Sequence, residues 1–200
     1  MRKILTLLVV IGWSISGHSQ TITASTDVDT LCPPACANLS AVWTGGGSTT
    51  AYDLTDIAYA PDAYAGTAVS LTDDSQTAML PIGFDFCFYG NTYNQFIICS
   101  NNWIGFSAGE TSTWVTNTVP STAADRPQNC IMGPWQDINP STGGNIMYQT
   151  LGVAPFRRLV VTYENVPMFS CTSMIFAAQI IIYESTNIIE NHISSKPICT

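Results

Sequence analysis

Alternating apolar residues in the segment 80–106 constrain the fold of this chain more than any other feature. The segment reads LPIGFDFCFYGNTYNQFIICSNNWIGF. Every second position of its first half is apolar: Ile82, Phe84, Phe86 and Phe88. Because side chains alternate between the two faces of a β-strand, this spacing predicts a strand with one buried face. We expect the chain to turn at residues 89–91 and again at residues 100–102.

The rest of the chain continues in the same manner. Further strands are expected at residues 131–135, 146–149, 156–164, 174–184 and 188–194, with shorter strand-like pieces at 53–59 and 67–71. No helical period appears beyond the first residues. The fold class is therefore all-β, an antiparallel β-sandwich or flattened barrel of about eight to ten strands. We expect this sheet to be incomplete at the C-terminus, with an open edge near the last strand.

The first residues predict export. Arg2 and Lys3 precede an apolar run at residues 4–13, and the small residues at 17–19 suit cleavage by signal peptidase. The expected domain organisation is a signal peptide at 1–19, an extended segment with a glycine-rich linker at 20–50, and a β-sandwich domain at 51–200. No stretch is long and apolar enough for a membrane helix, so we expect a secreted or cell-surface protein without membrane insertion.

Charge excludes nucleic acid as a partner. Removal of Arg2 and Lys3 leaves four of the six basic residues against fourteen acidic residues, a net charge near −10. Nucleic acids and anionic lipids are bound through lysine and arginine, which neutralise phosphates. Only 10% of the residues are charged, and small polar residues take their place, which is typical of extracellular β domains.

Seven cysteines in an exported chain predict disulfides. If residues 82–89 and 95–100 form an antiparallel hairpin centred on Tyr93, Cys87 lies opposite Cys99 on the face away from the phenylalanines, within reach of a disulfide bond. Two other pairings are open, Cys32 with Cys36 and Cys171 with Cys199, and Cys130 is then left over. The sequence does not decide between the many connectivities, so these pairings are preferences.

Few residues are suited to catalysis, and we predict that the chain is not an enzyme. His192 is the only histidine after signal removal, and its place in an alternating run predicts a solvent-facing strand residue. Three glutamates fall near strand ends: Glu164, Glu184 and Glu190. A suitably spaced pair could hydrolyse glycosides, but exposed strand glutamates commonly keep a sheet edge soluble. Glycine motifs for phosphate binding are absent.

One short motif resembles the start of a calcium-binding loop. Asp137, Asn139 and Ser141 alternate ahead of two glycines and offer oxygen ligands. Tyr148 stands where an EF-hand places its bidentate glutamate, and no helices are expected on either side. The alternative is a turn capped by its own side chains. Calcium is thus a candidate cofactor, and no other cofactor is expected.

Tryptophans provide candidate surfaces for stacking on sugars. Trp103 and Trp135 fall inside strand patterns, where burial is expected. Trp114 lies in the long polar loop 107–129 and is the candidate for a ligand-stacking residue. Loops of this length in compact domains are commonly functional.

Several segments together resemble a known family. LTDDSQTAMLPIGFDFCFYGNTYNQFIICSNNWIGF, GPWQDINPSTGGNIMYQTLGVAPFRRLVVTYENVPMF, QIIIYESTNIIENHI and KPIC resemble an N-terminal β domain of secreted Bacteroidota proteins associated with gliding motility and type IX secretion. The second half also resembles the nidogen-type extracellular domain. The resemblance covers residues 53–200, although Asn102 replaces a common glycine. It implies a cell-surface or secreted module and no chemistry.

These observations predict a non-catalytic extracellular module of a secreted or cell-surface adhesin-like protein. The alternative is a carbohydrate-binding module that is accessory to a glycoside hydrolase. The expected partners are an extracellular protein or glycan and further domains of the same polypeptide.

Overall fold

The computed structural model describes residues 21–26, 39–44, 51–108, 113–114, 119 and 126–199. The chain divides into two compact units, Met1–Gly47 and Ser48–Thr200. In the first unit, β1 (Thr21–Thr26) pairs with β2 (Leu39–Thr44) as an antiparallel hairpin. Cys32, Cys36 and the expected signal peptide lie outside the described residues, so those expectations stay predictions.

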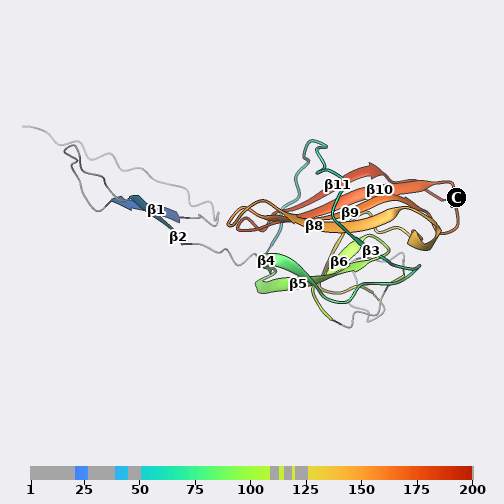
Figure 1. Ribbon diagram of the computed structural model, residues 1–200, viewed down its shortest axis with the longest axis horizontal. Coiled ribbons are helices and arrows are strands. Elements are labelled where there is room, and N and C mark those ends of the chain that lie inside the picture. Colours follow the sequence, from blue (N-terminus) through green and yellow to red (C-terminus); the bar gives the residue numbers. More distant parts are fainter. Residues whose placement is uncertain are drawn as a thin grey trace, which may run out of the picture. The chain divides into compact units, whose positions relative to one another are not determined.

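The second unit consists of two antiparallel sheets that appear as separate layers in Figure 1. The five-stranded sheet has the order β11-β10-β9-β8-β3. Its strands are β3 (Thr67–Val69), β8 (Asn145–Leu151), β9 (Arg158–Pro167), β10 (Ile175–Tyr183) and β11 (Ile189–Ser195). The four-stranded sheet contains β4 (Leu80–Phe88), β5 (Asn91–Cys99), β6 (Trp103–Gly105) and β7 (Cys130–Met132), in that order. A short 3-10 turn, η1 (Pro140–Thr142), precedes β8.

The core lies between the two sheets, which confirms the prediction of an all-β sandwich. The alternating residues of β4 point inward, with Ile82 and Phe86 fully buried. They share one apolar cluster with Leu159 and Val161 of β9 and with Ile180 of β10. Each buried side chain of this size stabilises the fold by about 1.5–3 kcal/mol. Neither sheet closes on itself, so the fold is a sandwich and not a barrel.

The hairpin β4–β5 turns at the residues that the sequence predicts. Phe88 pairs with Asn91, and the two residues between them have positive φ angles, 45° at Tyr89 and 80° at Gly90. A two-residue turn of this kind is type I′, which matches the twist of the flanking strands. The predicted turn at residues 89–91 is therefore confirmed, whereas the hairpin centred on Tyr93, on which the expected cysteine pairing depended, does not form.

This register separates the two cysteines that were expected to pair. Cys87 lies opposite Thr92, whereas Cys99 pairs with Trp103 of β6 at the far end of β5. Seven residues of extended strand separate Thr92 from Cys99, which amounts to about 23 Å. A Cys87–Cys99 disulfide is incompatible with this distance, and the prediction of that bond is wrong.

The outer face of the five-stranded sheet is covered by residues 59–64, which we call the strap. The Asp62 carboxylate forms an ion pair with Arg158 of β9, with 2.7 Å between Oδ2 and Nε. The carbonyl oxygen of Asp62 accepts a hydrogen bond of 3.0 Å from Gln179 Nε2 of β10. The segment 53–59 that leads into the strap forms no strand, contrary to prediction.

Residues beneath the strap are as buried as those of the core. Val160 and Thr162 of β9 and Ile181 of β10 have at most 1% of their surface exposed, although they face away from the other sheet. Both faces of β9 and β10 are therefore buried, which explains why these strands read as continuous apolar runs and not as alternating ones.

Candidate metal centre

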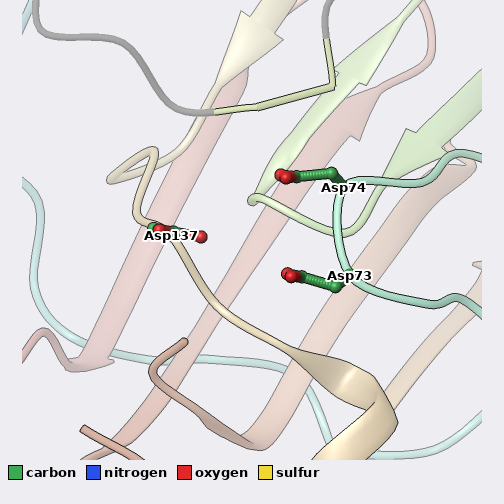
Figure 2. Close-up of side chains that lie close together, drawn as sticks. All are labelled: Asp73, Asp74 and Asp137. Atoms are coloured by element: carbon green, nitrogen blue, oxygen red, sulfur yellow. The ribbon is translucent and has the colours of Figure 1, made fainter. Parts of the chain in front are cut away.

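Three aspartates from two loops lie close together in the second unit. Asp73 and Asp74 form the turn between β3 and β4, and Asp137 lies in the connection from β7 to η1. One carboxylate oxygen of each residue lies within 4.8 Å of the other two. Figure 2 shows that the three side chains point toward a common space. Asp137 was a predicted ligand, whereas Asp73 and Asp74 were not among the predicted ligands.

The turn that carries Asp73 and Asp74 is attached to the end of β5. Ser75 O accepts a hydrogen bond of 2.8 Å from Ser100 N, and Ser75 N donates to Ser100 Oγ at 3.1 Å. Thr72 N donates to Ser75 Oγ at 2.8 Å, which closes the turn locally. Backbone pairing with the neighbouring sheet thus fixes the position of both carboxylates.

A buried asparagine joins the two loops. Asn101, in the β5–β6 turn, is fully buried. Its Nδ2 donates to Asp74 Oδ1 at 2.7 Å, and its Oδ1 accepts from Ile138 N at 3.0 Å. Since Ile138 follows Asp137 directly, Asn101 fixes the positions of the two loops, and hence of their carboxylates, relative to each other.

The Asp137 loop has further attachments. Phe169 N donates to the carbonyl oxygen of Asp137 at 2.9 Å, and Ile138 forms a β-bridge with Met168. Gln136 Nε2 donates to Pro197 O at 2.9 Å. The loop is therefore fixed on both sides of Asp137, by the β9–β10 connection and by the segment that follows β11.

Partial burial and mutual repulsion raise the pKa values of two of the three carboxyl groups. Burial, followed by the charge of Asp74, raises the pKa of Asp73 above its ordinary value. Burial, followed by the charges of Asp74 and Asp73, raises the pKa of Asp137. Each effect disfavours the ionised form, because the negative charges lie close together in a partly desolvated space. A cation between the carboxylates would reverse both effects.

The donor atoms are hard oxygens, which suit Ca²⁺ and Mg²⁺ better than zinc or copper. Asp73 Oδ1 is buried and has no hydrogen-bond partner. A buried carboxylate oxygen without a partner is costly unless it accepts a hydrogen bond or binds a cation. Asp73, Asp74 and Asp137 are the residues that could hold a divalent ion here.

Asn139 and Ser141, the other two predicted ligands, are used by the local backbone. Asn139 caps η1, and its Oδ1 accepts a hydrogen bond of 2.9 Å from Ser141 N. Ser141 Oγ accepts from Asp73 N at 3.3 Å. The structure therefore groups Asp137 with Asp73 and Asp74, while Asn139 and Ser141 form the capped turn that the sequence left as the alternative.

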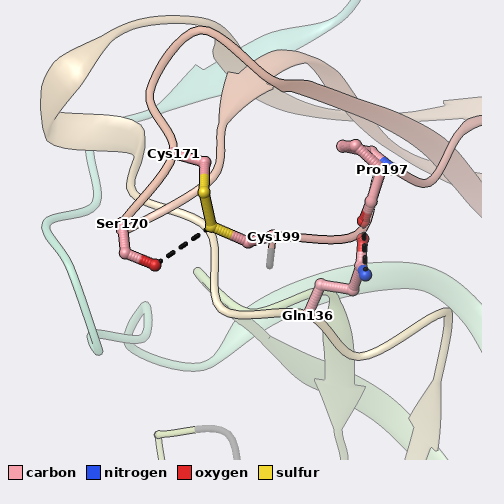
Figure 3. The surroundings of a disulfide bond; sticks show 5 residues. All are labelled: Gln136, Ser170, Cys171, Pro197 and Cys199. Carbon is pink, nitrogen blue, oxygen red and sulfur yellow. Dashed lines mark hydrogen bonds between the residues drawn. A yellow bond between two sulfur atoms is a disulfide. The ribbon is translucent and has the colours of Figure 1, made fainter.

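A disulfide lies near this centre. Cys171 and Cys199 are bonded, with 5.8 Å between their Cα atoms, as predicted (Figure 3). The bond joins the β9–β10 connection to the segment after β11. This segment also contains Pro197, the partner of Gln136, so the disulfide supports the loop that presents Asp137.

A comparison with known families identifies the chain's relatives. The profile of the family described as NIDO related matches residues 50–198, nearly all of the second unit. The chain belongs to the NIDO-related family. This agrees with the nidogen-type resemblance of the second half and with an extracellular type of domain. Comparisons with curated proteins and with solved structures found no significant match. Within the described residues, no helix is long and apolar enough to cross a membrane.

His192 of this NIDO-related chain is buried, with 4% of its surface exposed, contrary to the prediction that it faces solvent. Its Nδ1 accepts a hydrogen bond of 3.4 Å from Ala60 N of the strap, and its Nε2 lies 3.1 Å from Glu190 Oε2. Glu190 also accepts from Tyr183 at 2.9 Å. The strap covers the face of β11 that the sequence pattern predicted to be exposed to solvent.

The other polar candidates of the NIDO-related domain are dispersed. Glu184 forms an ion pair with Arg157 at 2.6 Å, and Glu164 accepts from Asn145 at 3.1 Å. Trp114 is 65% exposed, and its role in stacking stays a prediction. These groups and the three aspartates therefore do not form one site.

Proposed function

We propose that this chain is a non-catalytic extracellular interaction module of an adhesin-like surface protein. The observation that carries the proposal is the Cys171–Cys199 disulfide within a NIDO-related sandwich. Disulfides persist in oxidising compartments, and the family is of an extracellular type. Functional residues of such modules lie on surface loops held by a rigid scaffold. Gliding motility and type IX secretion are the finer assignment, supported by the resemblance of residues 53–200.

Display at the surface can be tested in the organism that encodes the chain. Intact cells are labelled with a membrane-impermeant biotin reagent, and the chain is recovered from labelled and unlabelled fractions. Labelling of the chain, lost when type IX secretion is disabled, supports the finer assignment. Labelling that persists without this system contradicts type IX export, and exclusion from the labelled fraction contradicts surface display.

Carbohydrate binding is the alternative function, and exposure of Trp114 favours it. The purified protein is applied to an array of glycans and of extracellular proteins, beside the variants Trp114→Ala and Phe169→Ala. Phe169 is also exposed and serves as the control for loss of an aromatic surface. Glycan binding lost only in Trp114→Ala supports the alternative. Binding to proteins alone supports the leading proposal.

Calcium binding is a second candidate property, favoured by the unpartnered oxygen of Asp73 and by the three converging carboxylates. The carboxylates would supply charge and oxygen ligands, and Asn101 would position Asp74 and the Asp137 loop. A bound Ca²⁺ would join the β3–β4 turn to the β7–η1 loop. Its role would be structural, because it would connect two loops that Asn101 already links by hydrogen bonds.

The calcium proposal predicts a stability change. Extracellular sites bind with Kd values of about 0.1–1 mM, so about 10 mM CaCl₂ should stabilise the fold by about 1.4–2.7 kcal/mol relative to EDTA. Asp137→Asn should abolish this difference. Asp56→Asn removes the same charge at an exposed position outside the cluster and should retain it. Equal stability of the unsubstituted protein in calcium and EDTA contradicts the proposal.

A further inference from the structure

β11 forms a long edge of the five-stranded sheet (Figure 1). It has seven residues and, in the described part of the chain, pairs with β10 alone. The other outer strands of the sandwich are short or protected. β3 and β7 have three residues each, and β4 accepts hydrogen bonds from Thr150 and Arg157 of the facing sheet. A long edge without such protection is suited to pairing with a further strand.

The backbone pairing with β10 shows which groups of β11 point outward. Tyr183 N donates to the carbonyl oxygen of Ile188 at 3.0 Å, so these two residues form a hydrogen-bonded pair. Hydrogen-bonded and non-hydrogen-bonded pairs alternate along an antiparallel ladder. Ile189, Asn191 and Ile193 therefore occupy non-hydrogen-bonded positions opposite β10, and their N–H and C=O groups point to the free edge.

No described segment pairs with these outward groups through its backbone. Residues 53–58, which lead into the strap, are all exposed, and none of them forms a backbone hydrogen bond with β11. The strap contacts β11 through a side chain, because Ala60 N donates to His192 Nδ1. Asn191 is exposed, and Ile193 has 46% of its surface exposed. The edge therefore offers both backbone groups and an apolar side chain to a partner.

The sequence of β11 is complementary to itself in the antiparallel direction. Residues 189–193 read IENHI. When two copies pair about a two-fold axis at Asn191, Ile189 lies opposite Ile193, and Glu190 lies opposite His192. Apolar residues then face apolar residues, an acidic residue faces a basic one, and no like charges are opposed, which favours the pairing. The outward backbone groups would form about six hydrogen bonds across the axis.

We infer that two copies of this chain pair through their β11 strands, so that their five-stranded sheets form one continuous sheet. Ile193 of each copy packs beside Ile189 of the other, which buries exposed apolar surface. The interface is isologous, because the same strand serves both copies. Assembly stops at the dimer, since β3 at the opposite edge of each sheet has only three residues. The inference goes beyond the proposed function and does not depend on it.

Sedimentation equilibrium of the purified chain tests this pairing at protein concentrations between about 1 µM and 1 mM, the range of weak to moderate affinities. We expect dimers to form within this range, and not at its lower end, because one pair of edge strands gives a small interface, and small interfaces are commonly transient. A chain that stays monomeric throughout the range overturns the inference.

Asn191 lies on the two-fold axis, so a charge placed there faces the same charge in the other copy. Asn191→Asp and Asn191→Lys should each weaken the dimer by roughly fivefold or more, because like charges are then directly opposed. An equal mixture of the two variants should form a heterodimer, since a carboxylate then faces an ammonium group. Asn191 is exposed, so both variants should keep the unfolding midpoint of the unsubstituted protein.

Matched controls place the same changes outside β11. Asn94→Asp and Asn94→Lys alter an exposed position of β5 and should leave dimerisation unchanged. Ile193→Lys should dissociate the dimer, whereas Ile198→Lys, at an exposed position beyond β11, should not. Dimers that persist in both Asn191 variants, or a mixture that associates no better than either variant alone, would show that β11 is not the interface.

Failure of this inference is distinguishable from failure of the proposed function. A monomeric chain that binds a glycan or an extracellular protein overturns the β11 dimer and leaves the extracellular binding role standing. A dimer that follows the expected Asn191 pattern, in a chain that is never displayed at the surface, contradicts the proposed function and supports the β11 pairing.

Discussion

Asn187 Oδ1 accepts a hydrogen bond of 2.9 Å from the backbone N–H of Cys87, a residue one hundred positions earlier. Asn187 lies in the β10–β11 turn, and Cys87 lies in β4 at the edge of the other sheet. Thr150 and Arg157 donate to the carbonyl oxygens of Ile82 and Gly83 along the same edge. The side chains of Thr150, Arg157 and Asn187 therefore form hydrogen bonds with backbone groups on the outer edge of β4. These bonds protect the edge from pairing with another chain.

Two substitutions of Asn187 distinguish the contribution of its hydrogen bond to stability from the contribution of its positive φ. Asn187→Gly keeps the positive φ of 54° but leaves Cys87 N without this acceptor, and should cost about 1–2 kcal/mol. Asn187→Ala should cost about 1 kcal/mol more, since alanine is disfavoured at this φ. Urea unfolding followed by tryptophan fluorescence measures both. Equal stability of the glycine variant and the unsubstituted protein would show that the bond contributes nothing.

Asn101→Ala should destabilise the fold by about 2–3 kcal/mol, because it leaves the buried Ile138 N–H without its acceptor and Asp74 without its donor. Asn94→Ala, at an exposed position of β5, is the matched control and should change stability by less than about 0.5 kcal/mol. Chemical denaturation in EDTA provides the comparison. Similar values for the two variants would contradict the proposed joining role of Asn101.

The aspartate cluster predicts a dependence of stability on pH in EDTA. The pKa values of Asp73 and Asp137 are raised in the folded state, so this state binds more protons from the ordinary value of 3.8 upward. The stability that these groups contribute is present below that value and is lost as the pH rises through the folded pKa values. A variant with both residues replaced by asparagine avoids this loss.

The double variant Asp73→Asn/Asp137→Asn should therefore match the unsubstituted protein near pH 3.5 and exceed it at pH 7. The gain should be less than about 1 kcal/mol, because solvent screens these partly exposed groups. Urea titrations across this range in EDTA measure the difference. A double variant that is less stable at pH 7 in EDTA would show that the carboxylates do not repel one another.

Removal of the disulfide should cost about 3–4 kcal/mol, because the bond closes a loop with a sequence separation of 28 residues. The double variant Cys171→Ala/Cys199→Ala is compared with the unsubstituted protein by urea unfolding. Reduction of the unsubstituted protein should produce a similar loss. Peptide mapping without reduction should recover Cys171 linked to Cys199, and a Cys87–Cys99 peptide would contradict the register of β4 and β5.

Much of the fold could be predicted from local pattern. The period of two in β4 and the apolar runs of β9 and β10 placed these strands within a few residues of their bounds. The turn of the first hairpin was predicted, but its register was not, because the polar segment 91–95 shows no alternation. Register is weakly specified where a strand segment has no apolar face.

The candidate metal centre was only partly predictable. Asp137 stood out within its own loop, but its neighbours Asp73 and Asp74 lie more than sixty residues earlier. The three aspartates lie together because Asn101 binds Asp74 and because the β3–β4 connection pairs with the end of β5. Both are tertiary contacts. The burial of His192 was not predicted for a similar reason, because the strap that covers it shows no strand pattern in the sequence.

The strap also separates the apolar β10 segment from other chains. β10 contains the run AAQIIIY, which is uncharged, strongly β-forming and free of proline and glycine, the composition of segments that assemble into amyloid fibrils. The strap and the second sheet cover its two faces. An ion pair between Asp62 and Arg158 therefore does more than close a surface segment. Together with the hydrogen bond from Gln179, it keeps the strap over one face of a segment whose composition suits fibril formation.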